Sequence, residues 1–154
     1  MDVKEFLKQP HIQKLLVEED MDKIFKQWIF TTVGNARLLK KFFEHAGIDP
    51  LEYLTVIPPS YCYYESPNIV RIPSNIIKID KLAFYKCNNL DKVYIPKSVH
   101  IIRTKAFYEC FYLNSVEYEG TMKEFKSISC GDSFTSPVSI ICSDGTIEHD
   151  GIQN

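Results

Sequence analysis

Residues 70–92 read VRIPSNIIKIDKLAFYKCNNLDK, and residues 93–115 read VYIPKSVHIIRTKAFYECFYLNS. The two stretches match position by position with a 23-residue period, and most of the matched positions are apolar. The matches are Ile72-Pro73 with Ile95-Pro96, Ile76 with Val99, Ile79 with Ile102, Ala83-Phe84-Tyr85 with Ala106-Phe107-Tyr108, Cys87 with Cys110, and Leu90 with Leu113. So many typed positions do not coincide in one register by chance, and a period of this length indicates an internal structural repeat.

A short strand motif begins each repeat, with apolar residues two positions apart that place both side chains on one face of a strand. The motif occurs with the same period as Val70/Ile72, Val93/Ile95 and Val116/Tyr118, and then as Val138/Ile140 after an interval that is one residue shorter. Stacked turns set such strands parallel, about 4.8 Å apart, so that like residues lie on like residues. The sequence therefore predicts a solenoid in whose interior Phe84 stacks on Phe107.

The same register places Cys87 and Cys110 on the inner side, where cysteine acts as a small apolar side chain. A disulfide between these two residues is the alternative. Five cysteines, an odd number, without a secretion signal favour free thiols over a disulfide framework.

The pattern Ile-Pro-x-x-(Ile/Val)-x-x-Ile-x-x-x-Ala-Phe-x-x-Cys-x-x-Leu-x-x-Val resembles the BspA-like leucine-rich repeat, over about residues 69–142. This family is common in bacteria, some protists and phage genomes. The resemblance implies a short β-rich solenoid, closed after Tyr118 by a terminating segment. Family members usually carry Ile-Gly where Asp80 and Arg103 follow isoleucine here. Family arrays are often long and secreted, whereas this short array beside a helical segment resembles small phage or prophage proteins.

Residues 1–57 are predicted to be a helical N-terminal segment. Two stripes have the spacing of one apolar helix face: Ile24, Phe25, Trp28 and Ile29, then Leu38, Leu39, Phe42 and Phe43. Asp49-Pro50 suits the start of a short helix that runs through Leu54. Two complete repeats cannot bury their own ends, so we expect these helices to cap the solenoid, giving an α+β fold.

Residues 58–68 form the predicted connector between this cap and the solenoid with its C-terminal cap at 69–154. Pro58-Pro59 and Pro67 exclude a regular helix there. The connector also carries Tyr61, Tyr63 and Tyr64, which either pack across the junction or form a binding patch.

Composition excludes several classes of protein. A net charge of −2 argues against binding of nucleic acid or anionic membranes by bulk electrostatics. No apolar run approaches the roughly 20 residues that span a bilayer. The stretch Met1-Asp2-Val3-Lys4-Glu5 lacks the pattern of a signal peptide, so we expect a cytoplasmic protein, of a bacterium or of an infected host cell.

Residues with catalytic or metal-binding chemistry show no recognisable spacing. The cysteines form no CxxC, the four histidines lack zinc-helix spacing, and the acidic residues near the C-terminus lack EF-hand spacing. A nucleophilic pair of Cys110 with His100 is the remaining catalytic option. We therefore expect no enzyme, no metal and no cofactor.

The candidate binding residues lie on two surface columns. Outward positions of the strands form the column Arg71, Tyr94 and Glu117, flanked by Ile69, Lys92 and Ser115. Tyr85 and Tyr108 form a second column, with Tyr112 near it. Tyrosine and arginine are favoured in interface hot spots, although simple solvation of one face is the alternative for either column.

These features favour a non-enzymatic protein–protein interaction module. One version is a phage-encoded protein that binds and inhibits a host protein or defence complex, so that the partner is a host or viral protein. The alternative is a structural subunit of a virion or other assembly that self-associates, and a homodimer fits either hypothesis. Neither nucleic acid nor a membrane is an expected direct partner.

Overall fold

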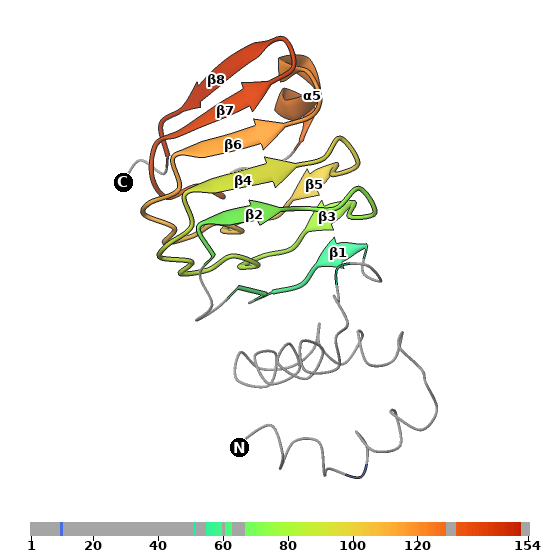
Figure 1. Ribbon diagram of the computed structural model, residues 1–154, viewed down its shortest axis with the longest axis vertical. Helices are drawn as coiled ribbons and strands as arrows, with labels where there is room; N and C mark the ends of the chain where they lie inside the picture. The colour runs from blue at the N-terminus through green and yellow to red at the C-terminus, as the bar shows by residue number, and fades with distance from the viewer. Residues whose placement is uncertain are drawn as a thin grey trace.

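The computed structural model describes residues 10, 51, 55–59, 61–62, 67–128 and 132–151. The described residues from 55 onward form a β-solenoid of about three turns (Figure 1). The helices predicted within residues 1–57, and with them the helical cap, lie outside the described residues apart from a few positions. Within the described residues, no helix has the length and apolar character needed to cross a membrane.

Two sheets run along the solenoid (Figure 1). The smaller sheet has the order β1-β3-β5, with β1 at Val56–Ile57, β3 at Lys78–Ile79 and β5 at Ile101–Ile102. The larger has the order β2-β4-β6-β7-β8, with β2 at Ile69–Arg71, β4 at Lys92–Ile95, β6 at Ser115–Tyr118, β7 at Val138–Cys142 and β8 at Gly145–His149. All pairings are parallel except the last, between β7 and β8.

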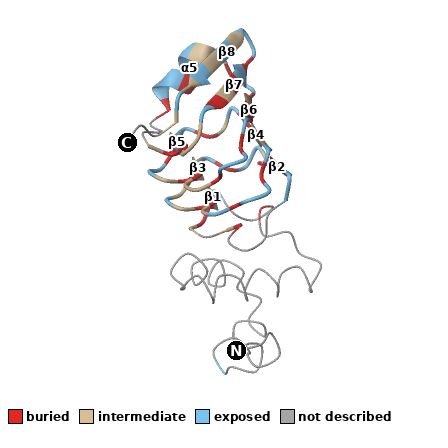
Figure 2. Cartoon of the chain, turned by 90° about the vertical axis from the view of Figure 1, so that its left-hand side faces the viewer, coloured by how far each residue is buried: buried red, intermediate tan, exposed pale blue. Residues whose placement is uncertain are grey.

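The repeat period sets the register of the parallel strands. Val70 lies opposite Val93, which in turn lies opposite Val116. All three are buried, and buried positions recur in every turn of the coil (Figure 2). The predicted stacking of like residues is therefore confirmed for β2, β4 and β6.

The register of β7 differs from the prediction. The strand motif in the sequence pairs Val116 with Val138, but the structure pairs Val116 with Ile140, two positions further along the chain. The connection after β6 contains the helix α5 (Met122–Ser127), so its length does not follow the repeat. A shift by two residues preserves the alternation of a strand, and both Val138 and Ile140 remain buried.

The solenoid begins earlier than the sequence indicated. Val56 and Ile57, assigned to the end of the helical segment, form β1 and pair with β3. Beside them, the Ile77 amide donates to the Thr55 carbonyl at 2.7 Å, and the Asp80 amide donates to the Ile57 carbonyl at 3.0 Å. Two residues are too few for a strand period to be visible in sequence, and Pro58-Pro59 pointed to a connector.

A column of stacked phenylalanine rings forms the centre of the core. Phe84 and Phe107 have ring centroids 4.9 Å apart and planes within 1°, which confirms the predicted stack. Phe134 extends the column at 5.3 Å from Phe107. Tyr61 meets the other end edge-on, at 6.2 Å from Phe84, so it packs against the core, whereas Tyr63 and Tyr64 lie outside the described residues.

Buried thiols line the same side of each turn. Cys62, Cys87 and Cys110 are free, so the alternative of a disulfide is wrong. The Cys87 thiol donates to the Cys62 carbonyl at 3.3 Å, and the Cys110 thiol donates to the Phe84 carbonyl at 2.9 Å. Hydrogen bonding to the neighbouring thiols of Cys110 and Cys62, together with burial, raises the pKa of Cys87 far above its ordinary value.

Helix α5 and the β7–β8 hairpin close the C-terminal end of the array (Figure 1). Helix α5 begins with a capping box, in which the Thr121 hydroxyl accepts from the Glu124 amide and the Glu124 carboxylate accepts from the Thr121 amide. Gly120 precedes the cap, and a Cβ there would lie 2.5 Å from the ring of Tyr118. That ring packs edge-on against Phe125 of α5, which ties the helix to the last repeat.

Candidate binding groove

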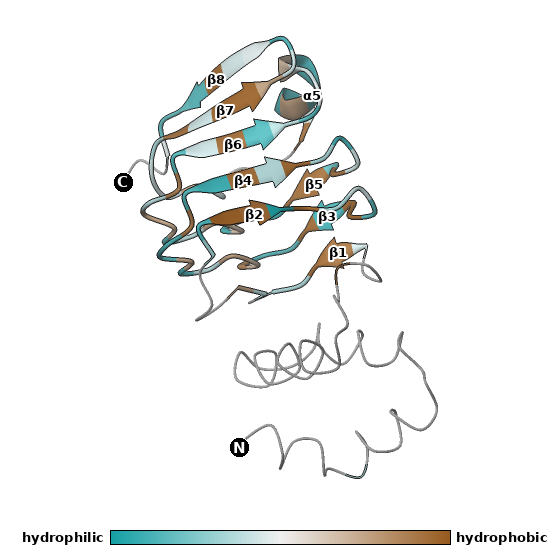
Figure 3. Ribbon diagram, in the orientation of Figure 1, coloured by the Kyte–Doolittle hydropathy of each residue, from teal (hydrophilic) through white to brown (hydrophobic). Residues whose placement is uncertain are grey.

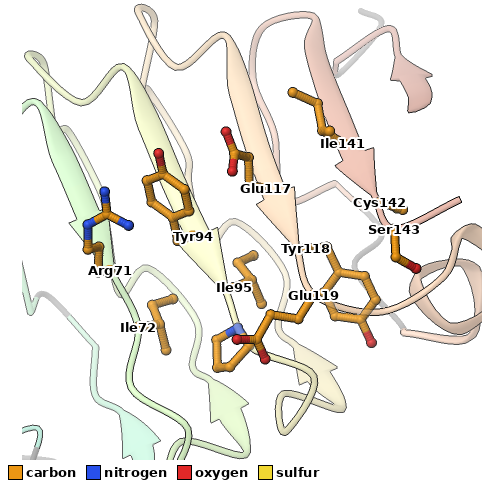
Figure 4. A pocket seen from close by; sticks show the side chains of 11 residues that line it. Arg71, Ile72, Tyr94, Ile95, Glu117, Tyr118, Glu119, Ile141, Cys142 and Ser143 are labelled. Atoms are coloured by element: carbon orange, nitrogen blue, oxygen red, sulfur yellow. The ribbon is translucent and has the colours of Figure 1, made fainter. Parts of the chain in front are cut away.

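A row of outward side chains crosses four strands of the larger sheet. Arg71 on β2 lies opposite Tyr94 on β4, Tyr94 opposite Glu117 on β6, and Glu117 opposite Ile141 on β7. We call these four residues the strand-face row (Figure 4). Each of these residues occupies an outward position of its strand, and adjacent members of the row come from different turns of the coil. Hydropathy varies along the strands that carry them (Figure 3).

The cationic end of the row is a guanidinium group over an aromatic ring. The guanidinium carbon of Arg71 lies 3.9 Å from the ring centroid of Tyr94. At an exposed site such a contact contributes about 0.5–1 kcal/mol, and it restrains both side chains. Within the described part of the chain, no carboxylate forms an ion pair with Arg71.

The next charges along the sheet are matched. The Lys92 ammonium lies 3.0 Å from the Glu117 carboxylate and 5.6 Å from the ring centroid of Tyr94. The hydrogen bond to Glu117 is the largest cause that raises the pKa of Lys92. Of the two cations Arg71 and Lys92, Arg71 is therefore the one that no described carboxylate pairs, so its charge is available for a ligand.

A groove of about 500 Å³ runs beside the row, towards the C-terminal ends of the strands (Figure 4). It is lined by Arg71, Ile72, Tyr94, Ile95, Pro96, Glu117, Tyr118, Glu119, Ile141, Cys142 and Ser143. The Glu119 carboxylate accepts from the Lys97 amide at 3.0 Å, which fixes an acidic group on this side of the groove. Burial is the largest cause that raises the pKa of Tyr118 above its ordinary value.

A family model described as "BspA type Leucine rich repeat region (6 copies)" matches residues 55–143, more than half of the chain. The chain belongs to this BspA-type leucine-rich-repeat family. The match begins at the residue before β1, in agreement with the early start of the solenoid.

Among solved structures, the chain is similar to a leucine-rich cell surface protein from Faecalibacterium prausnitzii A2-165, with 33% sequence identity and a TM-score of 0.46. The similarity covers 50% of this chain and 21% of that chain, so it spans about a fifth of the larger protein. The comparison with curated proteins found no match.

The BspA-type array brings together Arg71, Tyr94 and Glu117 as the sequence predicted, with Lys92 beside them. Ser115 is a correction, because it is buried although the sequence placed it on the exposed flank. It lies opposite Lys92 on β4 and Ser139 on β7, so neighbouring strands flank it on both sides. Its hydroxyl finds no hydrogen-bond partner among the described residues.

Ile141 is the member of the row that sequence reasoning missed. The spacing of the strand motifs placed it out of register with Glu117, whereas the observed pairing puts it in line. The adjacent pair Ile140 and Ile141 was the available signal, since a strand of alternating burial places two neighbouring residues on opposite faces.

The second predicted column also forms in the BspA-type coil. Tyr85 and Tyr108 stack with centroids 6.1 Å apart and planes within 13°, and both rings are half-buried. Lys86 lies 5.2 Å from the first ring and Lys105 lies 5.1 Å from the second. Tyr112 lies in the loop between Cys110 and β6 and is 70% exposed.

The structure does not support the candidate catalytic pair of Cys110 with His100. The Cys110 thiol is buried and donates to a backbone carbonyl, while His100 is exposed, so they do not form a nucleophilic pair. No three histidine, cysteine, aspartate or glutamate side chains gather in the described part of the chain to hold a metal ion.

Proposed function

We propose that this protein is a non-enzymatic protein–protein interaction module that binds its partner through the strand-face row and the adjoining groove. The observation that carries the proposal is the placement of Arg71, Tyr94 and Ile141 along one row of a stacked sheet, open to solvent beside a groove. Arginine and tyrosine dominate interface hot spots, and a solenoid presents them on a rigid surface. Membership of a leucine-rich-repeat family supports the same class of function.

The test is partner capture by a double variant, Arg71→Ala with Tyr94→Ala. The tagged protein and the variant are incubated with lysate of the natural host, and bound proteins are identified by mass spectrometry. Capture should be lost while the melting temperature stays nearly unchanged, because both side chains lie on the surface. Retained capture in the double variant would rule out this face.

The matched control is Lys105→Ala with Tyr108→Ala, which removes the same kinds of contact from the other column. Capture should survive in this control. Loss of capture in the control alone would indicate that the partner binds the column of Tyr85 and Tyr108 instead.

The finer version is a phage-encoded inhibitor of a host protein or defence complex that acts in the cytoplasm. Its support is the resemblance of a short array beside a predicted helical segment to small phage proteins. The same capture experiment tests it, since one dominant stoichiometric host protein is the expected result. Recovery of only the protein itself or of its own virus's proteins would contradict it.

A second candidate is self-association as a structural subunit, and the exposed loop before β6 favours it. Phe111 is 57% exposed and Tyr112 is 70% exposed, an adjacent pair of large apolar rings. Sedimentation velocity at micromolar concentration tests this candidate. Oligomers that dissociate in the double variant Phe111→Ser with Tyr112→Ser would support it, and a monomeric wild-type protein would exclude it.

A further inference from the structure

We propose that the groove recognises an extended segment of a partner protein that carries an aspartate or glutamate and, four positions away along the chain, a large apolar side chain. This inference rests on the proposed function and adds the chemistry of the segment. The carboxylate binds Arg71, and the apolar side chain packs on Ile141.

The carboxylate preference follows from the charges on the face. Arg71 holds its guanidinium against the ring of Tyr94, and a stacked guanidinium keeps the N–H donors at its edge open to solvent. That fork of donors matches a carboxylate with two parallel hydrogen bonds. The neighbouring cations are occupied, because Lys92 pairs with Glu117 at 3.0 Å and Lys97 pairs with Glu124 at 3.0 Å. Arg71 is thus the anion-binding end of the row.

The apolar preference comes from the opposite end of the same row. Ile141 is 40% exposed on β7, next to the antiparallel strand β8. An apolar side chain of the ligand that covers it removes apolar surface of both partners from water.

The separation of the two contacts sets the spacing in the ligand. Arg71 and Ile141 lie on β2 and β7, three strand intervals apart in the sheet order. Three intervals of about 4.8 Å amount to about 14 Å, and an extended chain covers this distance in four residues of about 3.4 Å. Residues i and i+4 of an extended chain point to the same side, so both side chains can face the sheet.

The middle of the groove adds a negative preference. Glu117 and Glu119 both line it, and a further carboxylate between the two anchor residues of the ligand would face them. The ligand should therefore carry its acidic residue at the Arg71 end and neutral or basic residues in between.

The experiment measures binding of fluorescent peptides to the full chain by anisotropy. The peptides have a Ser/Gly background, one aspartate, and one leucine at a separation of two, four or six residues. The four-residue peptide should bind about tenfold more tightly than the others, and added salt should weaken it. A second series carries lysine in place of aspartate and should not bind.

Two variants give the sharpest result. Arg71→Glu should abolish binding of the aspartate peptide and create binding of the lysine peptide at the same spacing. Ile141→Ser should remove the preference for a spacing of four while the requirement for aspartate remains. Lys123→Glu on the exposed surface of α5 is the control for net charge and should change neither.

Equal binding at all spacings, binding that Arg71→Glu leaves unchanged, or no binding up to about 1 mM peptide would each overturn the inference. The proposed function is judged separately by capture of the intact partner. If Arg71→Ala with Tyr94→Ala abolishes capture while the peptides show no preference, the face binds a protein by another chemistry and this inference alone fails.

Discussion

Phe107 occupies the middle of the stacked phenylalanine column in the core. Its ring lies between Phe84 and Phe134, and all three side chains are fully buried. A ring removed from the middle of such a column leaves a cavity that stiff neighbouring turns cannot fill.

Phe107→Ala should therefore lower the free energy of unfolding by about 3–5 kcal/mol, as measured by urea denaturation. Tyr112→Ala, which removes a largely exposed ring, serves as the control and should change stability by less than about 0.5 kcal/mol. A loss below about 1 kcal/mol in Phe107→Ala would show that the column can close over the gap.

The buried thiols should be chemically silent in the folded protein. The pKa of Cys87 is raised by hydrogen bonding and burial, so its reactive thiolate is suppressed, and burial also raises the pKa of Cys142. Cys130 lies outside the described residues, so it is first replaced by serine. In this Cys130→Ser variant, Ellman's reagent at pH 8 should label no thiol until denaturant is added.

The same shift has a consequence for stability. Because the folded pKa of Cys87 lies above its ordinary value of 9.0, the contribution of the protonated thiol to the free energy of unfolding is fully present below pH 9.0 and declines as the pH rises beyond it.

In the experiment with Ellman's reagent, rapid labelling at pH 8 without denaturant would show that the turns of the coil open locally.

At the scale of elements, helix α5 has a pH-dependent start. Donation from the Thr121 amide is the largest cause that lowers the pKa of Glu124, and Lys97 adds to it. A lowered folded pKa gives stability that is present above the ordinary value of 4.5 and is lost as the pH falls through the folded value. Glu124→Gln should reduce the loss of melting temperature on acidification; an unchanged acid profile would assign that loss to other carboxylates.

The cap hydroxyl of the same helix has its own test. Thr121→Ala removes the acceptor for the Glu124 amide and should destabilise the protein by about 0.5–2 kcal/mol in chemical denaturation. Thr121→Ser keeps that acceptor and should retain most of the stability.

Elements that obey the repeat were predictable, and those that depart from it were not. The inward Phe84 and Phe107, the outward Arg71 and Tyr94, and the parallel pairing of β4 with its neighbours all follow from the single repeat period. Phe134 lies further from Phe107 along the chain than one repeat, and β7 is displaced by two positions. Both lie beyond α5, where three-dimensional packing and not sequence spacing sets the register.

At the scale of the whole molecule, the first turn is an integral part of the core. Ile57 and Cys62 are buried in the same cluster as the repeats, Tyr61 covers Phe84, and the Cys62 amide donates to the Ala83 carbonyl at 3.2 Å. A repeat coil cannot leave an end of its core open to water.

A fragment of residues 67–154, which lacks this turn, should melt at a lower temperature than a fragment of residues 50–154. Calorimetry on both fragments checks the difference. Equal melting temperatures would show that β1 and the residues after it add nothing to the core of the coil.

The 23-residue length of the complete repeats also means that gene duplication could lengthen the array by whole turns. Duplication of one 23-residue unit within a gene would insert a complete turn, with its own strand and phenylalanine, without disturbing the face that any other residue presents. The distance between Arg71 and Ile141 would grow by one strand interval, about 4.8 Å. Such a duplication would change the length of the ligand segment that the groove binds, while Arg71 and Ile141 would remain at the two ends of the row.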